Sequence, residues 1–167
     1  MSTIAQTQRL RLRHFVTDDA AFIIELVNDP GWIRFIGKRN VRTLEDARGY
    51  LEKGPIDMYA RLGFGLYLVE LVHTAEPIGM CGLIKRPALE DVDIGFAFLP
   101  RFAGQGYAFE AATAVMSHAR ALGLDRIVAI LTRDNERSRR LLDRLGFRFE
   151  RLHESGGETL ELYATAD

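Results

Sequence analysis

The pattern of apolar positions divides the chain into short strands and amphipathic helices. Apolar alternation and runs of β-branched residues predict strands, over residues 9–13, 64–72, 78–85, 92–99, 127–131, 147–152 and 159–163. Apolar residues recurring every three or four positions predict helices, over residues 20–27, 43–51, 106–122 and 135–145. About seven strands and four helices in this order indicate a mixed α/β domain.

Turn and capping residues mark where these elements end. Thr43 and Asp46 have the spacing of a capping box at the start of the second helix. The first helix is expected to end before residues 29–31, Asp-Pro-Gly, and the second at about Leu51, with the Gly-Pro pair at 54–55 interrupting it. The three central strands follow one another with short turns, which predicts an antiparallel meander. With no repeat or linker, we expect one domain over residues 1–167.

Composition and charge exclude several classes of protein. The 167 residues carry 22 Lys and Arg against 23 Asp and Glu, a balance that gives no general attraction to nucleic acid. A single cysteine, Cys81, excludes an internal disulfide and a multi-cysteine zinc site, and no metal is expected. No apolar run approaches the ~20 residues that span a membrane. The first residues lack the order of a signal peptide, so we expect a cytoplasmic protein with no membrane partner.

A glycine-bearing turn between the strand at 92–99 and the helix at 106–122 is the most informative segment. Glycines let backbone N–H groups approach a ligand, and a helix N-terminus attracts negative charge. The turn therefore predicts a phosphate site, although a turn without a ligand remains open. Phe109 stands where a dinucleotide fingerprint needs its third glycine, and the Gly-Lys-Ser/Thr of a nucleoside triphosphate loop is absent.

Two linked motifs resemble one family over nearly the whole chain. The turn carries Arg101-x-x-Gly104-x-Gly106-Tyr107-Ala108, which resembles the acetyl-coenzyme A signature of the GNAT N-acetyltransferase superfamily. The next helix carries Asn135-x-x-Ser138-x-Arg140-x-x-x-Arg144-x-Gly146-Phe147, similar to the RimJ/RimL branch, which acetylates ribosomal-protein N-termini. The resemblance implies the GNAT fold, a mostly antiparallel sheet that splays at the coenzyme A site between flanking helices.

The resemblance also implies how acetyl-coenzyme A binds. The strand end is expected to pair with the pantetheine amides, and backbone N–H groups of residues 102–108 to hold the pyrophosphate. Arginines of the second motif would meet the 3′-phosphate, in a segment, residues 133–151, with seven Arg against four acids. The implied cofactor-binding residues are Phe98, Leu99, Arg101, Phe102, Ala103, Gly104, Gln105, Gly106, Tyr107, Ala108, Asn135, Arg140 and Arg144.

The chemistry implied is direct attack of a neutral amine on the thioester in a ternary complex. Much of the superfamily has a tyrosine proton donor where this chain has Leu142, and Ser138 is the candidate replacement. Asp93 is the candidate general base; the alternatives left open are Glu25, Glu70 and His14. Cys81 lies in an apolar strand, so we expect a buried structural cysteine rather than a nucleophile.

The sequence therefore predicts an N-acetyltransferase acting on a primary amine, either a protein N-terminal α-amine or a small-molecule amine. Trp32, Phe35 and Ile36 would line the acceptor cleft or belong to the core. The alternative function is a coenzyme A-binding sensor or regulatory module without transferase activity. A homodimer formed through a sheet edge remains open.

Overall fold

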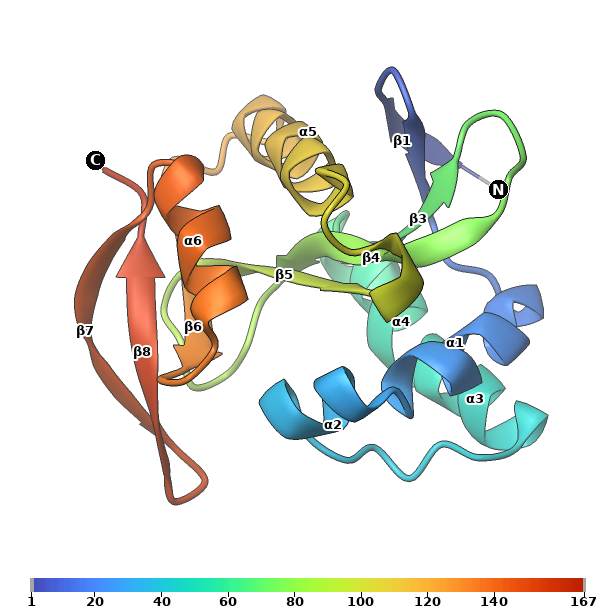
Figure 1. Ribbon diagram of the computed structural model, residues 1–167, viewed down its shortest axis with the longest axis horizontal. Helices are drawn as coiled ribbons and strands as arrows, with labels where there is room; N and C mark the ends of the chain where they lie inside the picture. The colour runs from blue at the N-terminus through green and yellow to red at the C-terminus, as the bar shows by residue number, and fades with distance from the viewer. Residues whose placement is uncertain (1, 167) are drawn as a thin grey trace.

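A computed structural model describes residues 2–166 and arranges them around an eight-stranded sheet (Figure 1). The strands are β1 (Thr3–Gln6), β2 (Leu10–Arg13), β3 (Leu66–Leu71), β4 (Pro77–Ile84), β5 (Val92–Phe98), β6 (Ile127–Thr132), β7 (Arg148–Ser155) and β8 (Glu158–Ala164). Their order across the sheet is β1-β2-β3-β4-β5-β6-β8-β7. Neighbouring strands pair antiparallel, apart from β5 and β6, which run parallel.

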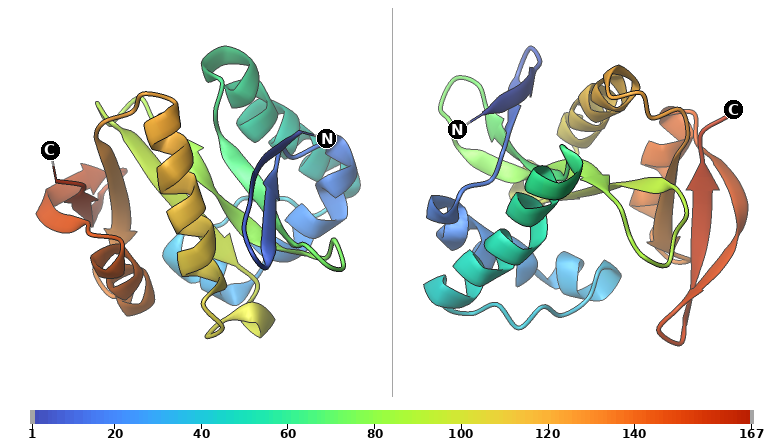
Figure 2. Two further views of the ribbon diagram at one scale, coloured as in Figure 1. Left: turned by 90° about the horizontal axis from the view of Figure 1, so that it is seen from above. Right: turned by 180° about the vertical axis from the view of Figure 1, so that it is seen from behind.

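Helices cover both faces of this sheet. They are α1 (Ala20–Val27), α2 (Pro30–Phe35), α3 (Leu44–Leu51), α4 (Asp57–Leu62), α5 (Tyr107–Ala121) and α6 (Glu136–Arg144). Helix α5 lies along one face, over β4 and β5, while α1 to α4 gather on the other (Figures 1 and 2). Helix α6 packs beside α5 and β6.

Strand alternation builds a separate core on each face of the sheet. Toward α5, the strands present Leu10, Leu12, Tyr67 and Val69 to a row of small residues on the helix, Ala111, Ala112, Val115 and Ala119. Toward α1 and α3, the next residues of β3 and β4, Leu68 and Met80, meet Ile23, Leu26 and Leu51. The inward orientation predicted for Leu10 and Leu12 is confirmed, since both side chains are fully buried.

The GNAT fold class is confirmed, the predicted elements follow one another in the expected order, and the first two predicted helices end as expected at Val27 and Leu51. Strand β1 and helices α2 and α4 were not predicted. Beyond the end of α1, the Asp29 carboxylate accepts from Gly31 N–H at 3.0 Å and caps α2, with Pro30 in the first turn, where no N–H is needed. The expected interruption at the Gly-Pro pair 54–55 does not occur, because after α3 a π-helical turn over Glu52–Ile56 leads directly into α4. The wider turn accommodates a residue without an N–H.

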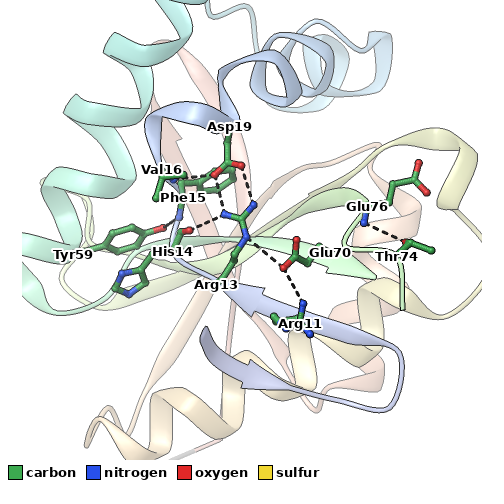
Figure 3. Close-up of polar contacts among 10 residues, drawn as sticks. All are labelled: Arg11, Arg13, His14, Phe15, Val16, Asp19, Tyr59, Glu70, Thr74 and Glu76. Atoms are coloured by element: carbon green, nitrogen blue, oxygen red, sulfur yellow. Dashed lines mark hydrogen bonds and ion pairs between the residues drawn. The ribbon is translucent and has the colours of Figure 1, made fainter. Parts of the chain in front are cut away.

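A buried cluster of charged side chains ties β2 and β3 to the start of the first helices (Figure 3). Arg13 forms a bidentate pair with Asp19, with both N···O distances at 2.9 Å. The Glu70 carboxylate lies 3.4 Å from Arg13 Nε and 3.3 Å from Arg11 Nη1. Asp19 also accepts the Val16 N–H at 2.9 Å, which fixes the chain as it leaves β2.

Replacing Asp19 with Asn is therefore expected to destabilise the fold by about 3 kcal/mol, because a buried arginine loses its carboxylate. Urea unfolding followed by circular dichroism measures this change. Asp18→Asn, at the exposed neighbouring position, is the matched control and should change stability by less than about 0.5 kcal/mol. Equal effects of the two substitutions would contradict a stabilising role for the buried pair.

Candidate functional site

The sheet opens between its two parallel strands. β5 and β6 pair only at Val92 with Ile127 and at Asp93 with Val128. Beyond these positions β5 remains paired with β4 and β6 with β8. In the part of the chain that the structure describes, residues 94–98 of β5 thus have no strand partner on the β6 side. An extended ligand with amide groups can pair with such an edge as an added strand.

The turn after β5 presents a row of backbone donors. Pro100–Phe102 form a 3₁₀ turn, and Gly104 and Gly106 then adopt left-handed conformations, with φ of +76° and +83°. Among residues 2–166, the N–H groups of residues 104–109 find no hydrogen-bond acceptor. They lie in the turn and first turn of α5, where the helix dipole also attracts an anion. We call residues 104–109 the amide loop.

Three of the amides expected to serve as donors are already used within the protein. Leu99 N–H donates to Ile78 O at 3.0 Å, and Leu99 is 2% exposed. Phe102 and Ala103 donate to Leu99 O and Pro100 O, both at 3.0 Å. Of the pyrophosphate donors expected over residues 102–108, the first two N–H groups are therefore not available, because they form the hydrogen bonds of the 3₁₀ turn.

Arg101 points away from the amide loop, toward α1. Its Nη1 lies 3.0 Å from a Glu25 carboxylate oxygen and its Nη2 3.7 Å from Glu76. The guanidinium carbon also lies 5.0 Å from the centre of the Phe102 ring. In this structure Arg101 therefore attaches the 3₁₀ turn to the helices on the other face of the sheet.

The second motif forms the start of α6. Asn135 caps this helix, and its Oδ1 accepts Ser138 N–H at 3.2 Å. The Ser138 side chain is half-buried, and its hydroxyl makes no hydrogen bond to the residues described. Arg140 is exposed, and the guanidinium carbon of Arg144 lies 4.0 Å from the centre of the Phe109 ring. The Arg144 contact joins α6 to the amide loop.

Another arginine of this helix has a structural role. Arg139 Nε donates to the Tyr163 hydroxyl at 3.1 Å, and Nη2 lies 2.9 Å from Glu161. It also pairs with Glu136 and the Arg133 carbonyl. These contacts hold α6 against β8, so the charge of Arg139 is balanced within the fold.

Asp93 occupies the point where β5 and β6 part. It is 1% exposed, and its side chain lies on the same face of β5 as Ala97, which packs toward α1 and α3. Arg86 Nε lies 3.1 Å from Asp93 Oδ1. Burial raises the pKa of the Asp93 carboxyl to about 6, and the nearby Arg86 limits this increase. A carboxylate with this pKa can accept a proton near neutral pH.

The alternative bases have other partners. Glu70 belongs to the buried cluster around Arg13, and Glu25 pairs with Arg101. His14 stacks on Tyr59 with ring centres 4.0 Å apart, and burial lowers the pKa of its imidazole. Cys81 is fully buried, as expected, and burial raises the pKa of its thiol well above the range of a reactive thiolate.

A cavity of about 920 Å³ opens near Asp93 on the face covered by α3 and α4. Its lining includes Arg39, Tyr50 and Ile84, and Ile84 is the cross-strand neighbour of Asp93. Neither Tyr50 nor Arg86 was among the candidate site residues predicted from the sequence. The position of Arg86 could have been predicted from the sequence. Pairing the strands at 78–85 and 92–99 as a hairpin brings the residues after the first strand, among them Arg86, beside Asp93 at the start of the second.

The expected acceptor-lining residues do not line this cavity. Trp32 is 6% exposed and packs in the core beneath α1 and α3. The guanidinium carbon of Arg34 lies 4.6 Å from the centre of the Phe35 ring. The Ile36 side chain is 43% exposed. The core interpretation therefore holds for Trp32.

Comparisons with known proteins place the chain among acetyltransferases. A family model described as acetyltransferase (GNAT) domain matches residues 9–148. The uncharacterized N-acetyltransferase YoaA of Bacillus subtilis (strain 168) is 31% identical over 152 residues, covering 90% of this chain and 85% of that protein. The crystal structure of an acetyltransferase from Agrobacterium tumefaciens str. C58 has a TM-score of 0.84 at 25% identity, covering 100% of this chain and 95% of that one.

A further solved structure shows a likeness of fold alone. It is RimL, a ribosomal L7/L12 alpha-N-protein acetyltransferase, in complex with coenzyme A. Its TM-score is 0.81 at 22% identity, and the match covers 98% of this chain and 97% of that one.

The burial of Asp93 predicts a carboxyl that titrates near pH 6. Carbon-13 NMR of the side-chain carboxyl measures this pKa directly. Arg86→Met should raise it further, because the neutral side chain no longer favours the carboxylate. Arg61→Met, which removes an exposed partner of Asp57, is the control and should leave the Asp93 titration unchanged. A midpoint near 4 in the unmodified protein would contradict the burial argument.

Proposed function

The chain belongs to the GNAT acetyltransferase family, and from this premise we propose that it transfers the acetyl group of acetyl-coenzyme A to a primary amine. The observation that carries the proposal is the amide loop, placed directly beyond the unpaired edge of β5. Together they offer an anion site and an extended hydrogen-bonding edge, which suit a ligand with a pyrophosphate and an amide-bearing arm.

The residues present fit coenzyme A. Backbone N–H groups of residues 104–108 would hold the pyrophosphate, and the edge of β5 up to Phe98 would pair with the pantetheine amides. Arg140 and Arg144, on the exposed side of α6, would meet the 3′-phosphate. When bound, acetyl-coenzyme A supplies an acetyl group activated as a thioester.

The proposed reaction is direct attack in a ternary complex. The amine nitrogen bonds to the thioester carbonyl carbon, and the carbon–sulfur bond breaks. The Asp93 carboxylate accepts the proton that the amine loses and releases it to water, while the Ser138 hydroxyl donates a proton to the departing thiolate and regains one from water. Free N–H groups on the edge of β5 would stabilise the negative charge on the carbonyl oxygen.

The pKa of Asp93 favours a protein N-terminal α-amine or a small amine of similar basicity. An α-amino group has a pKa of about 7.7–8.0, so an appreciable fraction is neutral at physiological pH. A lysine-type amine, with a pKa of about 10.4, must lose its proton first. A carboxylate with a pKa of about 6 is a weak base for that task but is sufficient for an α-amine.

A coenzyme A-binding sensor without transferase activity is the second candidate, and Leu142 favours it. This residue is 1% exposed, packs in the core and has no group that can donate a proton. If Ser138 does not replace the missing tyrosine, the protein binds the cofactor without efficient turnover.

Thermal unfolding with acetyl-coenzyme A and, in parallel, NAD tests the cofactor assignment. Acetyl-coenzyme A alone should raise the melting temperature in proportion to the logarithm of its concentration above Kd. Thiol release is then followed with peptides of different N-terminal residues and with small amines. Stabilisation with thiol release supports the transferase, stabilisation without release from any amine supports the sensor, and no stabilisation overturns both.

Ser138→Ala is expected to lower kcat by about 100-fold, as for the loss of a general acid, while the Kd for coenzyme A stays within about twofold. Stopped-flow thiol release and calorimetry measure the two effects separately. Ser117→Ala, an exposed serine on α5, is the matched control. Unchanged turnover in Ser138→Ala would remove this hydroxyl from the mechanism.

A further inference from the structure

Arg9 joins the N-terminal hairpin to the amide loop, from a position almost one hundred residues earlier in the chain. It directly precedes β2, and its Nη1 donates to the Gln105 carbonyl at 2.9 Å. Its guanidinium carbon lies 4.4 Å from the centre of the Tyr107 ring. A Cβ atom added at Gly106 would lie 3.3 Å from Arg9 Nη2. One side chain therefore contacts Gln105 and Tyr107 and leaves little room for a side chain at Gly106 between them.

Glu110 holds the guanidinium in this place. Its Oε1 accepts from Arg9 Nε at 2.7 Å, and its Oε2 accepts from the Arg9 backbone N–H at 3.1 Å. The Thr7 hydroxyl donates to the same carboxylate. Burial alone would raise the pKa of Glu110, but the hydrogen bonds from Thr7 and Arg9 outweigh it and lower the pKa, so the carboxylate stays ionised.

The hairpin that carries Arg9 is itself closed by local hydrogen bonds. Thr7 N–H donates to Leu10 O at 2.8 Å, and Leu10 N–H donates to the Thr7 hydroxyl at 3.1 Å. Arg9 is therefore presented from an ordered turn, and a side chain fixed at its base loses less entropy when its far end makes contacts.

The contact with Gln105 sets the direction of a donor. In a trans peptide the C=O and the following N–H point in opposite directions. Because the Gln105 carbonyl points to Arg9, the Gly106 N–H points away from it. The N–H groups of the amide loop have no acceptors within the described residues that would fix the orientation of the peptide between Gln105 and Gly106. The backbone dihedral angles of Gly104 and Gly106 also change easily, because glycine has no side chain.

We propose that Arg9 is a positioning residue that holds residues 105–107 so that the amide loop faces the pyrophosphate of coenzyme A, with Glu110 fixing Arg9. This inference rests on the proposed function, because it assumes that the loop binds that cofactor. Arg9 acts through the loop and does not itself contact the phosphates.

Calorimetry with coenzyme A and with dephospho-coenzyme A tests the role of Arg9. Arg9→Met should weaken both ligands by the same factor, about tenfold, equivalent to about 1.4 kcal/mol. The factors should agree because the pyrophosphate is common to both ligands, whereas the 3′-phosphate is not. Arg9→Lys keeps the charge but has no planar guanidinium to bind Glu110 and Gln105 together. Its affinity for both ligands should therefore lie between that of the unmodified protein and that of Arg9→Met.

Arg11→Met is the matched control. Arg11 lies two residues further along the same strand, carries the same charge, and pairs with Glu70 on the opposite face. This variant should bind both ligands as the unmodified protein does. Circular dichroism and melting temperature, measured for each variant, establish that binding is compared between folded proteins.

Glu110→Gln separates positioning from direct phosphate contact. The substitution retains the Arg9 side chain and removes a negative charge near the anion site. If Arg9 contacted the phosphates directly, binding should therefore be equal or tighter. Positioning predicts weaker binding, because Arg9 loses its anchor. Equal or tighter binding by Glu110→Gln, or unchanged binding by Arg9→Met, overturns the inference. Failure of the unmodified protein to bind either ligand instead overturns the proposed function.

Discussion

The site depends on the early separation of two parallel strands. If β5 and β6 paired along their whole length, the sheet would be continuous and the edge of β5 would have no free hydrogen-bonding groups. They part after Asp93 and Val128, and each keeps its other neighbour, so the sheet remains intact on both sides of the opening. The fold thereby exposes backbone polar groups, which are costly to leave unpaired where water is excluded, at the place where an extended ligand can satisfy them.

The position of Asp93 follows from the same separation. It is the last residue of β5 that pairs with β6, so its carboxyl is enclosed by the joined part of the sheet while the next residues border the opening. Enclosure explains the raised pKa, and the opening explains how a substrate can come near. The amide loop begins at the far end of the same strand. One seven-residue strand thus connects Asp93 with the amide loop.

Features with local causes could be predicted from the sequence. The glycines at 104 and 106, the capping box of Thr43 and Asp46 and the alternation in β2 depend on neighbouring residues, and the structure has them as expected. Features that depend on distant partners could not be predicted. Nothing near Arg9 indicates that it reaches Gln105. Helix α2 was not predicted although it had a local signal, since Asp before Pro is typical of a helix start.

The pairing of Arg9 with the amide loop has a consequence for biosynthesis. Gln105 and Glu110 follow Arg9 by 96 and 101 residues. At a ribosomal rate of about 5–20 residues per second, Gln105 and Glu110 are synthesised roughly 5–20 seconds after Arg9. During that interval β2 can meet β3, but the ligand site does not exist. Arg9 thus reaches its final surroundings long after it is synthesised, and such long-range closure is typical of slow folding.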